Sequence, residues 1–245
     1  MTILWLDTVD STNNEVSRKA DTLDNLSVIA AREQTSGKGQ RGNRWSSECG
    51  SNLTFSILLK DEALTLEASG QFAITQAVTL ALTDYLADRG ISAEIKWPND
   101  IYAGEKKICG VLIENSLSGN RIRKSVIGIG LNVNQTEFPE NLPNPTSMAL
   151  ESGRHYDTEN ELEMFLSCFE KYSSFPNDPQ TREELNRKYL QRMFRKDIPK
   201  KFLDIASGKE FTGIIRGTDE KGELLVQMPD GSTRAFGFKE IGYVL

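Results

Sequence analysis

The sequence predicts an α+β protein in which helices flank a mixed, largely antiparallel sheet and a small β-barrel follows at the C-terminus. Three observations favour this class over a doubly wound parallel sheet. Strand-like segments come in consecutive runs and do not alternate regularly with helices. One long apolar helix is expected near the middle of the chain. The last 50 or so residues hold short strand-like segments separated by turn signals.

The N-terminal part of the chain carries short strands around one helix. Residues 2–7 and 26–32 are typical of strands. A polar cap at residues 10–12 is expected to start a helix that runs to about residue 21. Residues 51–60 alternate apolar side chains on one face with polar side chains on the other, which is typical of a strand.

The middle of the chain contains the longest expected helix and a run of antiparallel strands. The helix covers residues 66–89, has an apolar stripe and ends at Gly90. A strand at 93–97 precedes residues 99–117, which read as two strands joined by a turn. Residues 123–134 form another strand, and one of its faces carries Gly128, Gly130, Asn132 and Asn134. Such a face lets a ligand approach the sheet closely, although an exposed antiparallel face would show the same period.

The amino-acid composition changes twice in the C-terminal part of the chain. Residues 135–158 form a loop rich in proline and asparagine, and two helices are expected near 159–173 and 181–193. Beyond them, short strands separated by turns are typical of a small SH3-like barrel. The sequence therefore predicts two domains, residues 1–195 and 196–245.

Composition excludes several kinds of function. The net charge of −6 argues against general nucleic-acid binding. One histidine, His155, rules out two-histidine metal sites and lies in a polar stretch unsuited to a catalytic triad. The three cysteines are widely spaced, so neither a disulfide framework nor a zinc knuckle is indicated. With no apolar run near the ~20 residues of a membrane helix and no signal-peptide pattern, we expect a cytoplasmic protein without membrane contact.

A glycine-rich loop at residues 37–45 concentrates positive charge in this acidic chain. Gly37, Gly39 and Gly42 allow a backbone that presents NH groups to an anion. The loop also carries three cations and an indole, on Lys38, Arg41, Arg44 and Trp45. It lacks the GxxxxGK[ST] pattern of a P-loop, and a flexible basic loop or an RNA-contacting loop could have this composition. The favoured interpretation is a local polyphosphate site.

A second motif surrounds the Trp-Pro pair of residues 96–100. Proline fixes its own φ and restricts its neighbour, so the turn would place Asn99 and Asp100 reproducibly. A carboxylate beside an amide suits a magnesium ion held partly by substrate phosphates. Lys107 follows at the start of the return strand. In an ideal strand Lys107 and Gly110 point to opposite faces, so a shared ligand needs a bulge or the Gly110 backbone.

Five segments occur in the order and spacing of biotin protein ligases, and the resemblance covers nearly the whole chain. They are residues 10–13 with Gln34, 37–45, 96–100, 107–114 and 128–134. The tail after residue 196 also resembles that family's SH3-like domain. The resemblance implies a fold similar to class II aminoacyl-tRNA synthetases and biotin ligases. It also implies a two-step reaction, in which biotin and MgATP form biotinyl-5′-AMP and pyrophosphate, and a lysine of a biotin carboxyl carrier protein then accepts the biotinyl group.

The resemblance further implies a role for each motif. The catalytic residues would be Lys107, which bridges biotin's carboxylate and the α-phosphate, and the phosphate-holding Lys38 and Arg41. Biotin would be bound by Ser11, Thr12, Asn13, Gln34, Gly37, Gly110 and Leu112. ATP would be bound by Gly39, Arg41, Arg44, Trp45, Asn99, Lys107 and Asn132, with Asp100 as the metal ligand. Ser11 and Thr12 are also candidate helix caps, and the two roles are compatible.

The chain departs from the family pattern in its glycine loop. Lys38, Gln40 and Asn43 stand where the family often has arginine. Because Gln40 is neutral, retention of the adenylate is expected to be weaker or to depend on Arg41 and Arg44. Some family members begin with a helix-turn-helix domain. Here the pattern starts at residue 5, so we expect a short form that binds no operator.

Other functions remain open at this point. A lipoate or octanoate ligase or transferase of the same superfamily would share the core, but it typically carries an Arg-Gly-Gly loop with a histidine. A non-catalytic sensor of biotin or nucleotide would need no reactive lysine. An exposed edge strand would allow a homodimer.

Overall fold

The computed structural model describes residues 1–60, 64, 66–173 and 179–244, without the side chains of Arg41 and Pro179. The N-terminal elements are β1 (Ile3–Val9), α1 (Thr12–Lys19), β2 (Val28–Gln34), η1 (Gln40–Gly42), β3 (Leu53–Lys60), η2 (Ala68–Gly70) and α2 (Phe72–Asp88). The middle elements are β4 (Glu94–Lys96), β5 (Asp100–Ala103), β6 (Lys106–Ser118), β7 (Arg121–Leu131), α3 (Met148–Ser152), α4 (Thr158–Glu170) and α5 (Pro179–Gln191). The C-terminal strands are β8 (Pro199–Asp204), β9 (Lys209–Thr218), β10 (Leu224–Gln227), β11 (Thr233–Phe236) and β12 (Ile241–Tyr243).

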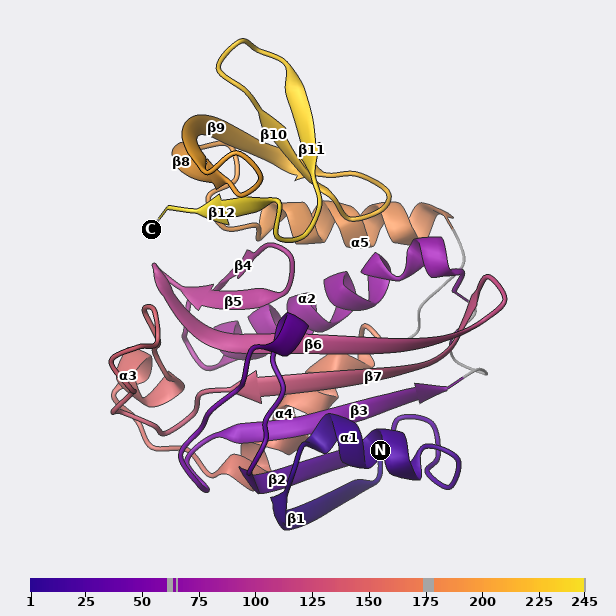
Figure 1. Ribbon diagram of the computed structural model, residues 1–245. Helices are drawn as coiled ribbons and strands as arrows, with labels where there is room; N and C mark the ends of the chain where they lie inside the picture. Colours follow the sequence, from indigo (N-terminus) through magenta and orange to yellow (C-terminus); the bar gives the residue numbers. More distant parts are fainter. Residues whose placement is uncertain (61–63, 65, 174–178, 245) are drawn as a thin grey trace.

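The main sheet has seven strands in the order β1-β2-β3-β7-β6-β5-β4 (Figure 1). β1 pairs with β2 in parallel, and every other neighbouring pair in this sheet is antiparallel. The predicted α+β class with a mixed, largely antiparallel sheet is therefore confirmed.

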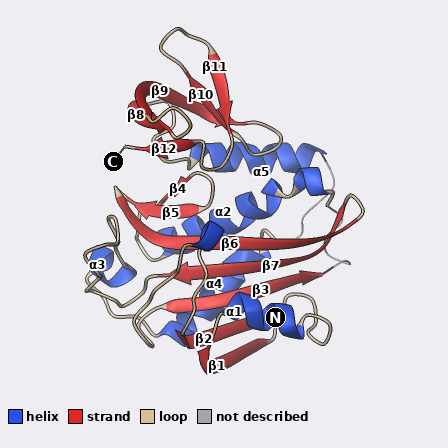
Figure 2. Ribbon diagram, viewed as in Figure 1, coloured by secondary structure: helices blue, strands red, loops and turns tan. Residues whose placement is uncertain are grey.

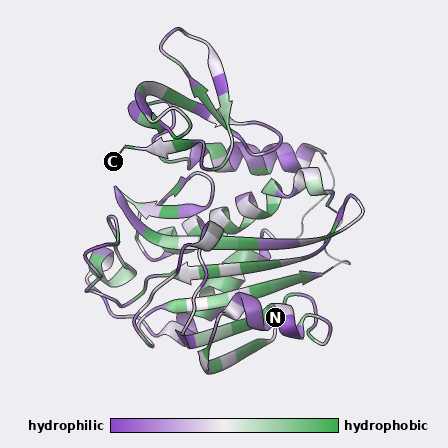
Figure 3. Ribbon diagram, in the orientation of Figure 1, coloured by the Kyte–Doolittle hydropathy of each residue, from purple (hydrophilic) through white to green (hydrophobic). Residues whose placement is uncertain are grey.

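The two faces of this sheet are covered differently (Figure 2). On one face α1 packs against β2, β3 and β7 through a small apolar cluster that includes Val16, Ile29 and Leu58. On the other face α2 packs against β4, β5 and β6 and against α4, and the largest apolar core lies between them. The apolar residues concentrate there, which Figure 3 shows as green segments in the strands and α2. Because α1 is short, it leaves the remainder of its face of β7, β6 and β5 free for a site.

The C-terminal strands form a second, antiparallel sheet in the order β11-β10-β9-β8-β12. No pairing joins its edge strands β11 and β12 in the described ranges, so this sheet is open and a closed SH3-like barrel is not confirmed. The division into domains at residue 195 stays a prediction. No described helix has the length and apolarity needed to cross a membrane.

Candidate active site

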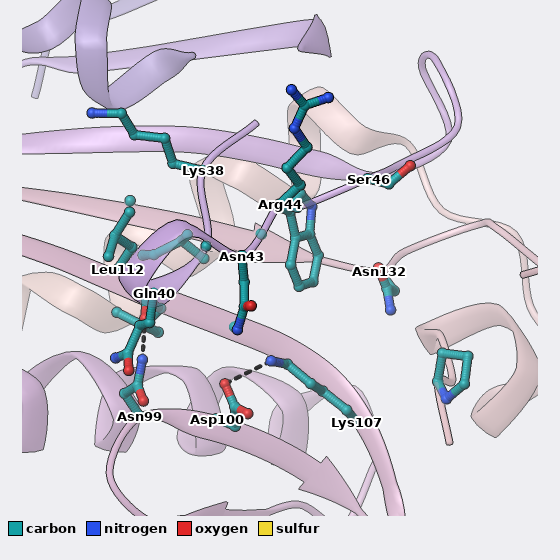
Figure 4. Close-up of a pocket in the computed structure, with 18 of the residues that line it drawn as sticks. Lys38, Gln40, Asn43, Arg44, Ser46, Asn99, Asp100, Lys107, Leu112 and Asn132 are labelled. Carbon is teal, nitrogen blue, oxygen red and sulfur yellow. Dashed lines mark hydrogen bonds and ion pairs between the residues drawn. The ribbon is translucent and has the colours of Figure 1, made fainter. Parts of the chain in front are cut away.

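A cavity of about 720 Å³ lies on the α1 face of the main sheet, and it collects most of the residues that the sequence singled out. Those that line it are Ser11, Thr12, Asn13, Gln34, Lys38, Gly39, Arg44, Trp45, Asn99, Asp100, Lys107, Gly110, Leu112 and Asn132. Figure 4 shows Lys107 and Asp100 facing each other, with Asn43 and Asn132 nearby, whereas the guanidinium of Arg44 points away from this pair. The structure therefore brings the five motifs together, while the ligand assigned to each residue stays a prediction.

Two of the predicted residues are not among those that line the cavity. The side chain of Arg41 lies outside the described residues. Gly37 is buried beneath the loop, where a Cβ would stand 2.3 Å from the carbonyl oxygen of Trp45. Trp45 N donates to Gly37 O at 3.0 Å, and Gly39 N donates to Asn43 O at 2.7 Å, so the loop closes on itself. Gly37 thus shapes the loop.

One end of the cavity is a polar cluster where α1 meets β2 and β3. Thr12 donates to Gln34 Oε1 from its backbone N at 2.8 Å and from its hydroxyl at 3.2 Å. Ser56 Oγ lies 2.7 Å from Thr12 Oγ1 and 2.6 Å from Asn13 Oδ1. Ser56 was not predicted as part of this site, although the alternation of residues 51–60 had placed it on the polar face of its strand.

Ser11 occupies the N-cap position of α1, but its side chain makes no capping hydrogen bond. Its backbone is extended, and the side chain is almost completely buried beside the cavity. The side-chain oxygen Oε1 of Gln34 instead accepts a hydrogen bond from the Thr12 backbone N–H at the start of the helix. The capping interpretation of the Ser11 hydroxyl is therefore wrong, because a long-range partner from β2 has taken that function.

The glycines on β7 make room for side chains of this same protein. A Cβ on Gly128 would stand 2.1 Å from Asn13 Oδ1, and one on Gly130 would stand 2.3 Å from Cε2 of Trp45. From the sequence, a ligand is expected to lie close to this glycine face. In the structure the side chains of Asn13 and Trp45 occupy that space. Asn132, the first residue after this strand, donates through Nδ2 to Thr146 O at 2.9 Å.

A β-bulge decides where Lys107 points. Ile101 pairs with Cys109, whereas the next residue, Tyr102, pairs with Lys107, so Ile108 is the extra residue of β6. Ile108 and Cys109 are both fully buried. Lys107 and Gly110 consequently share the cavity face, and a Cβ on Gly110 would lie 3.2 Å from Lys107 Nζ. Of the two arrangements that the sequence left open, the structure has the bulge.

Two lysine–carboxylate pairs involve the cavity; Lys38, Asp100 and Lys107 line it, and Glu114 lies outside the lining. Lys107 Nζ lies 2.8 Å from Asp100 Oδ1, and both side chains are about 30% exposed. Lys38 Nζ lies 3.3 Å from Glu114 Oε1, and Glu114 Oε2 accepts from Asn13 Nδ2 at 2.7 Å. Glu114 thereby connects the glycine loop to α1. Glu114 belongs to one of the segments that resemble the family. Its contact with Lys38 joins residues that are 76 positions apart, so the local sequence could not predict it.

The C-terminal sheet supports the Trp-Pro turn beneath the cavity. Trp97 Nε1 donates to Gly222 O at 2.8 Å, and its ring packs against that of Phe238 with centroids 6.3 Å apart. Gly222 has a φ of +85°, and a Cβ there would stand 2.4 Å from Cγ of Phe72. The turn that carries Asn99 and Asp100 is therefore held by residues more than 100 positions away.

Replacing Trp97 with phenylalanine is expected to lower the free energy of unfolding by about 1–2 kcal/mol, because the Gly222 carbonyl loses its buried partner while most of the ring packing is kept. Urea unfolding measures this loss. Trp5, half-buried on the edge strand β1, is the matched control, and Trp5→Phe is expected to cost less than about 0.5 kcal/mol. Equal losses in the two variants would contradict a supporting role for the Trp97 N–H.

Comparisons with known proteins show what this chain is similar to. The chain is 29% identical over 238 residues to the bifunctional ligase/repressor BirA of Bacillus spizizenii, across 96% of this chain and 72% of that protein. It is also 29% identical to the biotin–[acetyl-CoA-carboxylase] ligase of Paracoccus denitrificans, across 91% of this chain and 92% of the relative.

A solved structure shows the same fold. The biotin protein ligase from Aquifex aeolicus in complex with biotin and ATP superposes with a TM-score of 0.77 at 28% identity, covering 98% of this chain and 97% of that one. The sequence profile of the biotin/lipoate A/B protein ligase family matches residues 5–132, just over half of the chain. The protein belongs to the biotin/lipoate A/B protein ligase family.

Proposed function

We propose that this protein is an ATP-dependent biotin protein ligase, which activates biotin to biotinyl-5′-AMP and transfers it to a lysine of a biotin carboxyl carrier protein. One observation carries the proposal. The bulge in β6 directs Lys107 into the cavity, and the polar cluster at α1 lines the same cavity. The names of the relatives support the choice of biotin, since the matched family also includes lipoate ligases.

The polar cluster suits the ureido ring of biotin. That ring offers two N–H donors and one carbonyl acceptor, and hydroxyl and amide groups can pair with both kinds. Ser11, Thr12 and Gln34 present such groups at one end of the cavity. Asn13, Gly110 and Leu112 would complete the biotin end.

The first step joins two anions. An oxygen of biotin's carboxylate forms a bond to the α-phosphorus of ATP, the bond from that phosphorus to the bridging oxygen breaks, and pyrophosphate leaves with the electron pair. Like charges about 4 Å apart repel by roughly 4 kcal/mol at an effective dielectric constant of 20. The Lys107 ammonium would offset this repulsion and stabilise the charge of the transition state.

The glycine loop and the end of β7 would hold the nucleotide. Lys38 and Arg44, which line the cavity with Gly39, would supply positive charge for the phosphates, and the sequence assigns the same role to Arg41. Trp45, Asn99 and Asn132 would contact the nucleotide, since all three line the cavity around Lys107.

Magnesium would accompany the ATP. Asp100 is paired with Lys107, and the described residues contain no group of three histidine, cysteine or carboxylate side chains that could hold a metal. The residues present therefore fit a magnesium ion bound mainly by phosphates with one carboxylate, which is common for this ion. When bound, the ion would neutralise phosphate charge.

The second step needs a protein partner. The neutral amine of the carrier's lysine bonds to the acyl carbon of biotinyl-5′-AMP, the bond from that carbon to the phosphate oxygen breaks, AMP leaves with the electron pair, and the amine loses a proton to solvent. Residues 1–195 would form the catalytic domain. Residues 196–245 would form the SH3-like domain, which their five antiparallel strands support.

Biotin-dependent release of pyrophosphate from MgATP tests the proposal, with lipoate and octanoate as control acids. Release with biotin alone, followed by transfer of labelled biotin to one lysine of a carrier domain, is the expected result. Release with lipoate or octanoate would assign the protein to the sister activity. Tight biotin binding without release by any acid would favour a sensor.

A further inference from the structure

Glu114 on β6 has no role in the steps above, although it contacts two of the segments that form the site. Its register partner on β7 is Val126, which belongs to the apolar cluster beneath α1, so Glu114 lies on the cavity side of the sheet. Oε1 lies 3.3 Å from the Lys38 ammonium of the glycine loop, and Oε2 accepts from Asn13 Nδ2 at 2.7 Å. Figure 4 shows the Lys38 side chain pointing away from Lys107, in agreement with this pairing. One carboxylate therefore joins the loop to α1.

This carboxylate fixes the orientation of the Asn13 amide. Asn13 is 3% exposed and stands over Gly128, where a Cβ would lie 2.1 Å from its Oδ1. An ionised carboxylate only accepts hydrogen bonds, so the Asn13 atom that faces Glu114 has to be the NH₂ group. The amide oxygen is thereby turned toward Ser56, whose hydroxyl donates to it at 2.6 Å. The opposite orientation would place two acceptors together at Glu114.

The direction of the hydrogen bonds passes from Asn13 to Thr12. A hydroxyl carries one proton, and Ser56 gives its proton to Asn13, so Ser56 can only accept at its 2.7 Å contact with Thr12 Oγ1. Gln34 Oε1, the other neighbour of the Thr12 hydroxyl, is also an acceptor and lies 3.2 Å away. The proton of Thr12 is therefore used within the cluster. Only lone pairs of Thr12 Oγ1 are left for a ligand.

Thr12 consequently presents an acceptor to the cavity that it lines. The complementary group on a ligand is an N–H donor, which the ureido ring of biotin supplies, whereas a ring oxygen at the same place would put two acceptors together. Glu114 does not line the cavity and acts through the buried side chains of Asn13 and Ser56. Its effect is thus on the direction of the hydrogen bonds and not on a contact with the ligand.

We propose that Glu114 is a positioning residue, which fixes the direction of the hydrogen bonds from Asn13 through Ser56 to Thr12 and makes Thr12 an acceptor for a ring N–H of biotin. The inference rests on the proposed function for the identity of the ligand. It assigns to a carboxylate outside the cavity lining the selection of a ligand that offers a donor at this position over one that offers an acceptor.

Calorimetric binding of biotin and of its two cyclic carbamate analogues tests the direction of these hydrogen bonds. Each analogue has a ring oxygen in place of one ureido N–H, so one of the two isomers places that oxygen against Thr12. The wild type is expected to bind this isomer about 100-fold more weakly than biotin, because the two acceptors repel and neither is paired.

Glu114→Gln keeps the shape of the side chain but allows the direction to reverse. The Lys38 ammonium attracts the new amide oxygen, which leaves the Gln NH₂ group to donate to Asn13 Oδ1. The Asn13 amide then turns, Ser56 can donate to Thr12, and the Thr12 proton can reach the ring oxygen of the carbamate. The preference for biotin over this isomer is therefore expected to fall about 10-fold, the value of one hydrogen bond.

Glu33→Gln is the matched control, because Glu33 is exposed on β2 beside Gln34 and does not line the cavity. It is expected to leave the preference unchanged. Equal weakening of all three ligands by Glu114→Gln, or no change in any, would overturn the inference. A reduced preference in a protein that releases no pyrophosphate with biotin would uphold the role of Glu114 and overturn the ligase proposal. A wild-type protein that binds none of the three ligands would overturn both.

Discussion

Lys107→Ala is expected to slow biotin-dependent pyrophosphate release by about 100- to 1,000-fold, which is typical when one preorganised donor to a developing charge is lost. The reason is the position of the ammonium, which the bulge at Ile108 directs into the cavity beside Asp100. Single-turnover measurements with saturating biotin and MgATP would isolate the chemical step. Biotin binding without ATP, measured by calorimetry, is expected to change much less than the rate.

Lys106→Ala controls for the loss of a positive charge on the same strand, since its side chain is exposed beside Lys107. This control should keep the wild-type rate. If Lys107→Ala retained more than about a tenth of the rate, the assignment of Lys107 to the reacting phosphate would be wrong. If the protein were a non-catalytic sensor, Lys107→Ala would weaken ligand binding, and neither the wild type nor the variant would release pyrophosphate.

Glu161→Ala is expected to lower the free energy of unfolding by about 3 kcal/mol, because it removes the anion from a buried polar group between α2 and α4. Glu161 Oε2 accepts from Tyr85 Oη at 2.5 Å and from Arg89 Nε at 2.7 Å, and the Glu161 side chain is 6% exposed. Burial and the nearby carboxylate raise the pKa of the Tyr85 phenol, which therefore stays a donor. Without Glu161, a buried hydroxyl and a largely buried guanidinium lose their partner.

Glu163→Ala provides the comparison, because Glu163 lies on the exposed face of the same helix. Unfolding in urea should show a loss smaller than about 0.5 kcal/mol for this control. The Glu161 group lies on the face of the sheet opposite the cavity, so the rate of pyrophosphate release at low temperature is expected to be unchanged in both variants. A normal urea midpoint for Glu161→Ala would show that the pair contributes nothing to folding.

Local chemistry made much of the site predictable. Proline restricts the backbone and glycine frees it in any context. The turn at residues 96–100 and the loop at residues 37–45 can therefore be recognised from their own sequence, without knowing which segments contact them. The strand over residues 51–60 followed from its alternating pattern and is present as β3. The long helix was expected from residue 66, but α2 begins at Phe72 because residues 68–70 form a separate 3₁₀ turn.

Contacts between segments far apart in the chain could not be predicted from the local sequence. A period of two along a strand does not reveal one inserted residue, and the bulge at Ile108 is a property of the pairing between β5 and β6. The pairing of Glu114 with Lys38, and of Trp97 with the Gly222 carbonyl, likewise join positions far apart in the chain. Nothing in the local sequence specifies such partners.

The residue types that the chemistry needs can be recognised in the sequence without the fold: a cationic glycine loop, a rigid turn with an amide and a carboxylate, and a lysine close behind it. The α+β class can be recognised in the same way, because hydrophobic periodicity is a local property. Tertiary structure alone decided that Lys107 and Gly110 share one face, that Asn13 and Trp45 fill the space above Gly128 and Gly130, and that Ser56 joins the polar cluster. The physical reason is that register, bulges and side-chain approach depend on hydrogen bonds between strands that the chain brings together only when it folds.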